Sequence, residues 1–181
     1  MARSLLGLDI GTSAVRAAEV SAKTDPPTLA RFHSVPLPRG SVAGGEIVDR
    51  DAVVAALREL VSRGRFTVKH TAIGIANQKV VVRQIDMPAM AEEELRGALQ
   101  FQAQEYIPIP IEDAILDFQI LEENANEAGE QTLKVLLVAG QRDMINGFVT
   151  LAQQVGLDPA VVDLSPFADM RALGSSQPLP P

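Results

Sequence analysis

Hydrophobic positions recur with a period of two in some stretches of this chain and with a period near 3.6 in others. An apolar run at Leu5–Ile10 is separated by a short turn at Gly11–Ser13 from a second apolar run that begins at Ala14. A period of two indicates strands, so the two runs predict a hairpin with its polar groups at the tip. Thr28–Leu37 alternates in the same way between prolines and predicts a third strand, and Glu46–Val48 predicts a short one.

A helical period begins at Arg50 and continues to Arg63. The apolar residues of this stretch share one face, namely Val53, Val54, Leu57, Leu60 and Val61. Asp49 or Asp51 can cap the start of the helix, and Gly64 fits its end. Thr71–Ala76 follows as a short apolar run between polar flanks, which predicts a buried strand.

A new group of elements begins near Asn77 and has the order strand, helix, strand, strand. In sequence these are a strand at Val80–Met87, a helix at Glu92–Tyr106, and strands at Ile115–Leu121 and Gln131–Ala139, joined by an acidic loop at Glu122–Glu130. Three glutamates in the first turn of the helix favour its N-terminal end.

The last third of the chain returns to longer elements. Arg142–Val155 has a helical period, Pro159–Leu164 predicts a strand, and Pro166 opens a final helix that runs to Leu173. Gly174–Pro181 is rich in serine and proline, so we expect a disordered tail.

Composition narrows the class of protein. The chain has 181 residues, of which 46% are hydrophobic, and it contains no cysteine, which excludes disulfides and cysteine-metal sites. No stretch approaches the roughly 20 apolar residues that cross a bilayer, and no signal segment precedes the first strand. We therefore expect a cytoplasmic protein without direct membrane insertion.

Charge is distributed unevenly along the chain. The net charge is −7, and residues 91–130 carry eleven acidic residues against one basic residue, Arg96. Such a segment repels phosphates, so no nucleic-acid partner is expected. The acidic stretch is either a solvated face or a docking surface for a basic segment of a partner.

The hairpin tip concentrates groups that suit phosphate and Mg²⁺. Gly11 allows the backbone to approach a ligand closely, Thr12 and Ser13 add hydroxyl donors, and Arg16 can neutralise phosphate. Asp9 repels phosphate but can hold a hydrated Mg²⁺. The alternative is an ordinary hairpin in which these polar residues only satisfy the turn.

Leu6–Arg16 resembles the first phosphate motif of the actin-like ATPase superfamily, which includes actin, heat-shock chaperones, sugar kinases and FtsA. The resemblance implies ATP and Mg²⁺ as cofactors, with Asp9 acting on the metal and Gly11–Ser13 holding phosphate. Arg16 would occupy the position of the actin lysine, although arginine presents its donors in a different geometry.

A second resemblance is more specific. Met87–Pro110, followed by Leu116–Phe118, closely resembles the PilM family of actin-like type IV pilus assembly proteins, and the resemblance covers residues 4–173. It implies an α/β fold in which an actin-like (ribonuclease H-like) subdomain, 1A, carries an inserted strand-helix-strand-strand (SHS2-like) subdomain, 1C. The expected boundaries are residues 1–76 and 164–173 for 1A, 77–163 for 1C, and 174–181 for the tail.

The resemblance also implies a binding function. Proteins of this family are cytoplasmic scaffolds at the inner face of the membrane, where they bind the N-terminal tail of the membrane protein PilN and work with other inner-membrane and motor components of the pilus. By resemblance, the tail lies in a groove between 1A and 1C. Candidate groove residues are Tyr106, Ile107, Ile109 and Phe118, because prolines hold an apolar segment there that cannot be regular structure. The alternative is that these residues close the core of the insert.

Members of the family continue for a comparable length beyond this chain, and that second half supplies the other phosphate loop and the adenosine contacts. Because most contacts to the nucleotide would be missing, we expect no ATPase activity and weak or absent ATP binding from this chain, and no residue is predicted to be catalytic.

Two other functions stay open at this stage. Asp-Ile-Gly-Thr-Ser at Asp9–Ser13 also opens carbohydrate kinases, in which Asp86 or Asp117 would have to deprotonate the substrate. Alternatively, proteins similar to FtsA polymerise through 1C contacts, so an exposed edge strand of the insert could pair with another copy.

Overall fold

The computed structural model describes residues 4–23, 26–125, 129 and 131–174 and divides the chain into two units. Unit 1 consists of residues 1–77 and 146–181, and unit 2 of residues 78–145. Apart from Gly174, the tail expected to be disordered lies outside the described residues.

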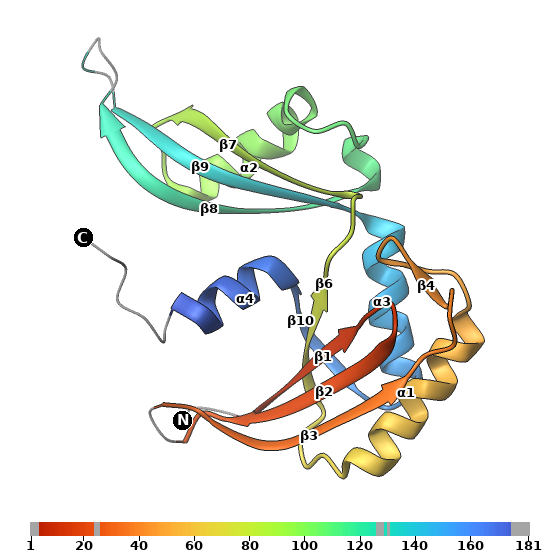
Figure 1. Cartoon of the computed structure of the whole chain (residues 1–181). Coiled ribbons are helices and arrows are strands. Elements are labelled where there is room, and N and C mark those ends of the chain that lie inside the picture. Colours follow the sequence, from red (N-terminus) through yellow and green to blue (C-terminus); the bar gives the residue numbers. More distant parts are fainter. Residues whose placement is uncertain (1–3, 24–25, 126–128, 130, 175–181) are drawn as a thin grey trace. The chain divides into compact units, whose positions relative to one another are not determined.

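Unit 1 is built on a mixed sheet of five strands. Its strands are β1 (Leu5–Ile10), β2 (Ala14–Ser21), β3 (Thr28–Pro36), β6 (His70–Ile75) and β10 (Asp158–Leu164). Their order is β10-β6-β1-β2-β3 (Figure 1), with β1, β6 and β10 parallel and with β2 antiparallel to both β1 and β3. This is the mixed α/β arrangement predicted for the first subdomain. A separate two-stranded ribbon joins β4 (Val42–Ala43) to β5 (Glu46–Ile47).

Helices cover the two faces of this sheet unequally. In Figure 1, α1 (Arg50–Gly64) and α3 (Arg142–Gln154) lie on one side and α4 (Ser165–Gly174) lies on the other. Strand residues with side chains towards α1 and α3 are large and buried, as Leu6, Leu8 and Ile73 show. By contrast, α4 buries none of its side chains among the described residues. The core of unit 1 therefore lies on the α1 side of the sheet.

The ends of α1 show one correct and one incorrect prediction. Asp49 caps the helix as expected, because its side chain accepts a hydrogen bond of 3.0 Å from the Ala52 N–H. The predicted stop at Gly64 is wrong by one residue, since Gly64 is still helical and Arg65 takes the left-handed conformation, with φ of 49°. Position 64 favours glycine for a different reason, because a Cβ there would lie 2.2 Å from the Phe66 ring.

A buried carboxylate ties the segment after α1 to the sheet. Glu19 on β2 is 3% exposed and accepts hydrogen bonds from the Thr67 N–H at 2.7 Å and from Arg31 Nη1 at 3.0 Å. The Thr67 hydroxyl donates a third, at 2.5 Å. Burial raises the pKa of Glu19, but these hydrogen bonds and the charge of Arg31 outweigh it and lower the pKa below the usual 4.5.

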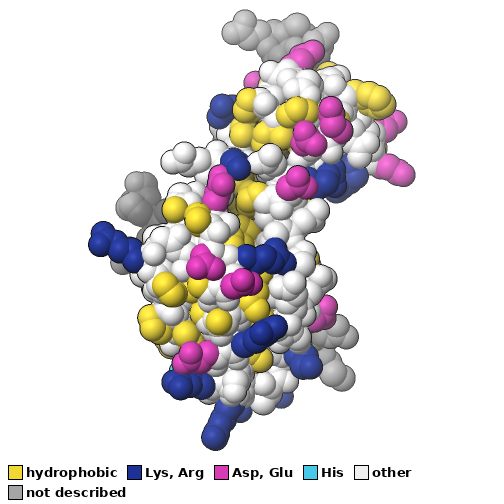
Figure 2. Space-filling model, turned by 90° about the vertical axis from the view of Figure 1, so that its right-hand side faces the viewer, with side chains coloured by type: hydrophobic (Ala, Val, Ile, Leu, Met, Phe, Trp, Pro, Cys, Tyr) yellow, Lys and Arg dark blue, Asp and Glu magenta, His cyan; other side chains and the backbone are white. Residues whose placement is uncertain are grey.

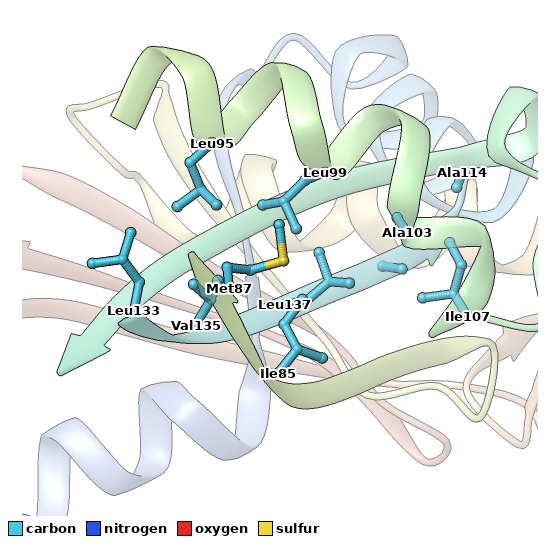
Figure 3. Packing of buried hydrophobic residues seen from close by; sticks show 11 residues of the cluster. Ile85, Met87, Leu95, Leu99, Ala103, Ile107, Ala114, Leu133, Val135 and Leu137 are labelled. Atoms are coloured by element: carbon cyan, nitrogen blue, oxygen red, sulfur yellow. The ribbon is translucent and has the colours of Figure 1, made fainter. Parts of the chain in front are cut away.

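Unit 2 has the predicted order of strand, helix, strand, strand. Its elements are β7 (Val80–Pro88), α2 (Glu92–Gln102), the 3-10 turns η1 (Ala103–Glu105) and η2 (Ile111–Asp113), β8 (Ala114–Ala125) and β9 (Gln131–Gln141). The sheet is antiparallel in the order β7-β9-β8. Figure 3 shows Leu95 and Leu99 of α2 directed towards Met87 and Leu137 of the sheet, and all four side chains are buried. An amphipathic helix on one sheet face therefore forms this core.

Strand β8 is longer than expected. The predicted acidic loop starts at Glu122, but in the structure Glu122–Ala125 continues β8 and pairs with β9 after an irregularity between Ile120 and Glu122. Lys134 Nζ lies 2.8 Å from Glu122 Oε2, so a cross-strand ion pair compensates for the low strand propensity of the acidic residues.

The boundary between the two units also differs from the prediction. The insert was expected to end at residue 163, whereas unit 2 ends at Ile145, within the first turns of α3. Strand β10 pairs in parallel with β6, from Asp158 beside His70 to Leu164 beside Ile75, so it belongs to the sheet of unit 1. The side chains of Phe148 and Leu151 on α3 are buried as well.

The surface carries charged and apolar side chains together. On the face shown in Figure 2, hydrophobic side chains are interspersed with acidic and basic ones. No helix within the described part of the chain is long and apolar enough to cross a membrane.

Candidate functional site

The hairpin of β1 and β2 brings Asp9 and Arg16 together. The two residues are directly opposite each other in the antiparallel ladder. Arg16 Nη1 donates to Asp9 Oδ2 at 2.9 Å, and the side chains are 41% and 50% exposed, respectively. The predicted metal carboxylate and the predicted phosphate cation therefore neutralise each other across the hairpin.

The turn residues lie at the tip as expected. The Gly11 N–H donates to the Ala14 carbonyl at 3.0 Å and closes the turn, so this amide already has a partner. The Ser13 carbonyl accepts from the Leu37 N–H at 2.9 Å, which anchors the turn to the segment after β3. Thr12 and Ser13 are exposed. Their side chains are therefore the accessible donors of the turn.

Two pockets of unit 1 meet at Asp9. The larger, of about 480 Å³, has a floor of small residues on the α4 side of the sheet, Gly7, Ala18, Ala72 and Gly74, and is also lined by Arg16. The smaller, of about 130 Å³, is lined by Gly11 and Thr12. Asp9 lines both pockets, whereas Arg16 lines only the larger one. Arg16 thus lies beside Asp9 in the larger pocket, and its guanidinium is also close to Gly11 of the turn, because a Cβ at Gly11 would lie 3.0 Å from Arg16 Nη1.

Ser165 and Asp163 are site residues that the sequence reasoning missed. Ser165, the first residue of α4, lines both pockets, and a Cβ at Gly74 would lie 2.9 Å from its hydroxyl oxygen. Asp163 lies beside Gly74 in the β10–β6 ladder, as Asp9 does in the β1–β6 ladder. Asp163 is paired with Arg171. The cross-strand register, which the sequence alone does not reveal, is the signal that finds these residues.

The residues at the hairpin fit Mg²⁺ and phosphate in part. A half-exposed carboxylate suits a hydrated cation, and a Cβ at Gly11 would fill the space beside Asp9 Oδ2, 3.4 Å away. Within the described residues, no cluster of three or more His, Asp or Glu side chains is arranged to hold a metal. The site can therefore offer one carboxylate to a cation, with hydroxyls beside it for an anion.

The second candidate set lies in unit 2, where Tyr106, Ile107 and Ile109 come from the segment between α2 and β8 and Phe118 comes from β8. Ile107 is only 4% exposed and belongs to the core, whereas Tyr106, Ile109 and Phe118 are half-buried and pack against that core. Arg96 stacks over the Phe118 ring at 4.8 Å. For Ile107, this placement fits the alternative that it closes the core of the insert.

Gln104 holds this irregular segment in place. Its side-chain amide donates to the carbonyls of Ile107 and Ile109, both at 3.4 Å, and its oxygen accepts from the Ile111 N–H at 3.1 Å. One side chain thus satisfies three backbone groups in a stretch whose prolines prevent regular structure.

The residues of the two other hypotheses are exposed in unit 2. Asp86 lies on β7 opposite Lys134, and Asp117 on β8 accepts a hydrogen bond from the Phe118 N–H at 2.9 Å. Strand β8 forms one edge of its sheet. Both carboxylates are exposed. The edge strand β8 remains a predicted self-association surface.

Comparison with known proteins identifies similar chains. Residues 7–180 match the sequence profile of a family described as type IV pilus assembly protein PilM. A solved PilM-PilN type IV pilus biogenesis complex has a chain that is 30% identical, with a TM-score of 0.83 over 97% of this chain and 52% of that one. The present chain thus spans about half the length of that solved chain.

A second solved structure shows a similar fold. The cytoplasmic domain of EpsL, an inner-membrane component of the type II secretion system of Vibrio cholerae, has a TM-score of 0.55 at 15% identity. The match covers 88% of this chain and 56% of that one. Together with the match to the PilM-PilN chain, this similarity confirms the predicted α/β fold class.

Proposed function

Because this chain belongs to the family of type IV pilus assembly protein PilM, we propose that it is a docking scaffold for the N-terminal tail of the membrane protein PilN. In this role it works in the cytoplasm, at the inner face of the membrane, where its membrane-anchored partner holds it. The single observation that carries the proposal is the structural match to the chain of a PilM-PilN complex, with a TM-score of 0.83 over 97% of this chain.

The chemistry of unit 2 supports a tail with apolar anchors and basic residues. Tyr106, Ile109 and Phe118 offer half-buried apolar surface, braced by the hydrogen bonds of Gln104. Residues 78–145 contain thirteen acidic and five basic residues, so the unit attracts a basic segment. Apolar anchors would give such a complex most of its affinity, and charge would set its rate of association.

A fluorescence-anisotropy titration with a labelled PilN tail peptide tests this proposal. We expect Tyr106→Ala to weaken binding at least tenfold, since truncating a central aromatic contact costs about 2 kcal/mol or more. Because Tyr106 also packs on the core, the melting curve of the variant must show that the fold is retained.

Phe101→Ala is the matched control. Phe101 is an aromatic residue of the same unit, is 86% exposed, and is not among the candidate residues. Its removal should leave binding unchanged within about twofold. Equal losses for Tyr106→Ala and Phe101→Ala would contradict the proposed surface.

We also propose that this chain alone is a weak nucleotide binder, because its hairpin would contact phosphate and Mg²⁺ from one side only. A calorimetric titration with ATP and Mg²⁺ should give millimolar binding or none, and no hydrolysis should be measurable. Micromolar affinity would contradict this proposal without affecting the docking role.

A further inference from the structure

The pairing of Asp9 with Arg16 is built into the hairpin. The register of β1 and β2 places the two residues opposite each other, so both side chains leave the same face of the sheet. Arg16 Nη1 lies 2.9 Å from Asp9 Oδ2. Any change that preserves the hairpin keeps the two residues opposite each other, although their half-exposed side chains can still move.

The guanidinium also takes up the space beside the turn. A Cβ at Gly11 would lie 3.0 Å from Arg16 Nη1 and 3.4 Å from Asp9 Oδ2, so both charged groups lie against the α-carbon of Gly11. A divalent cation bound to Asp9 on this side would lie close to Arg16. Because like charges repel at such distances, the arginine and the cation compete for the carboxylate.

The larger pocket has space for a second conformation of the Arg16 side chain. Arg16 lines this pocket of about 480 Å³, whose floor of glycine and alanine leaves room for a long side chain to turn. Both partners of the ion pair are roughly half-exposed. Exposed ion pairs are weak, so an incoming cation can displace the arginine without unfolding the hairpin.

We propose that Arg16 is a positioning residue that gates the cation position at Asp9. Its guanidinium holds the carboxylate in competition with a divalent cation, and binding of the cation releases the guanidinium to meet an anion such as phosphate. Cation and anion binding are thereby coupled through one side chain. This inference rests on the proposed phosphate and Mg²⁺ role of the hairpin and adds the residue that couples the two ligands.

Titration of the full ¹⁵N-labelled chain with Mn²⁺ tests the gate. Mn²⁺ broadens nearby amide signals, so the signals of Gly11 and Thr12 report a cation on Asp9. We expect Arg16→Gln to bind Mn²⁺ about fivefold more tightly than the wild type, because the competing charge is gone. Asp9→Asn should abolish the specific broadening.

Two matched variants separate the gate from a general charge effect. Arg39→Gln removes the same charge from an exposed position of unit 1 and should leave the Mn²⁺ affinity unchanged. Arg16→Lys restores a cation beside Asp9 and should return the affinity towards the wild-type value. Equal affinities for Arg16→Gln and Arg39→Gln, or no specific broadening in any variant, would overturn the proposal. The proposed docking role is tested by peptide binding, so neither result of the Mn²⁺ titration affects it.

Discussion

Replacing Glu19 by glutamine should destabilise unit 1 far more than the loss of one surface charge would. Glu19 is 3% exposed and accepts three hydrogen bonds, two from Thr67 and one from Arg31. Glutamine keeps the shape, but its amide nitrogen must face one of these donors, and Arg31 loses its counter-charge. The segment that leads from α1 into β6 would then lose its tie to the sheet.

The size of the effect follows from burial. Hydrogen bonds to a charged group contribute about 1.5–3 kcal/mol each, and breaking a buried ion pair costs about 3–5 kcal/mol. Because the amide oxygen of glutamine can still accept the two hydrogen bonds that Glu19 Oε1 accepts, we expect a loss of about 2–4 kcal/mol in the free energy of unfolding. Glu59→Gln is the matched control, since Glu59 pairs with Arg63 on the exposed surface of α1 and its loss should cost less than about 0.5 kcal/mol.

The pH dependence provides an independent check. The folded state lowers the pKa of Glu19 below its usual 4.5, so the unfolded chain takes up this proton at a higher pH than the folded protein does. The stabilisation is therefore complete above the unfolded pKa and is lost as the pH falls through the folded one. The difference between the wild type and Glu19→Gln should shrink as the solution is acidified from pH 6 to about pH 3.

Urea unfolding followed by NMR measures each unit separately. The amide signals of Gly7 and Gly74 report unit 1, and those of Gly97 and Gly140 report unit 2. We expect the unit 1 signals alone to shift to lower urea in Glu19→Gln. A loss below 0.5 kcal/mol, or a difference that does not change with pH, would refute this account of the network.

Two further predictions concern packing and backbone conformation. Arg65→Gly should stabilise unit 1 by about 0.5–1 kcal/mol in the same urea experiment, because glycine adopts the left-handed conformation at this helix end without strain; a loss of stability would show that the Arg65 side chain matters more than its backbone. Leu99→Ala should destabilise unit 2 by about 2–5 kcal/mol, since Leu99 is buried in the core between α2 and the sheet; unchanged unit 2 signals would contradict that packing.

Periodicity predicted the elements well because the core of each unit is one-sided. Val53, Leu57 and Leu60 on α1 are buried, as their spacing indicates. Leu95 and Leu99 on α2 are buried for the same reason. The hairpin register could also have been inferred, because Asp9 and Arg16 flank the turn symmetrically. An ion pair between them was therefore accessible from the sequence.

The pairing of strands that are far apart in the chain could not be predicted from the sequence in the same way. Pro159–Leu164 was correctly predicted as a strand, but nothing in its composition shows that it pairs with β6, and the boundary at 163 was wrong for that reason. The same pairing of β10 with β6 places Asp163 and Ser165 beside the pocket at Asp9. The left-handed conformation falls on Arg65, one residue after the glycine that the helix-end rule favours, and nothing in the structure explains this shift.

The docking role itself is tested most directly by one titration. The wild-type chain is added to a fluorescently labelled peptide of the PilN N-terminal tail, with a scrambled peptide of identical composition measured beside it. The account predicts saturable binding of the native peptide and at least tenfold weaker binding of the scrambled one. Equal binding of the two peptides, or no saturable binding of the native peptide, would contradict it.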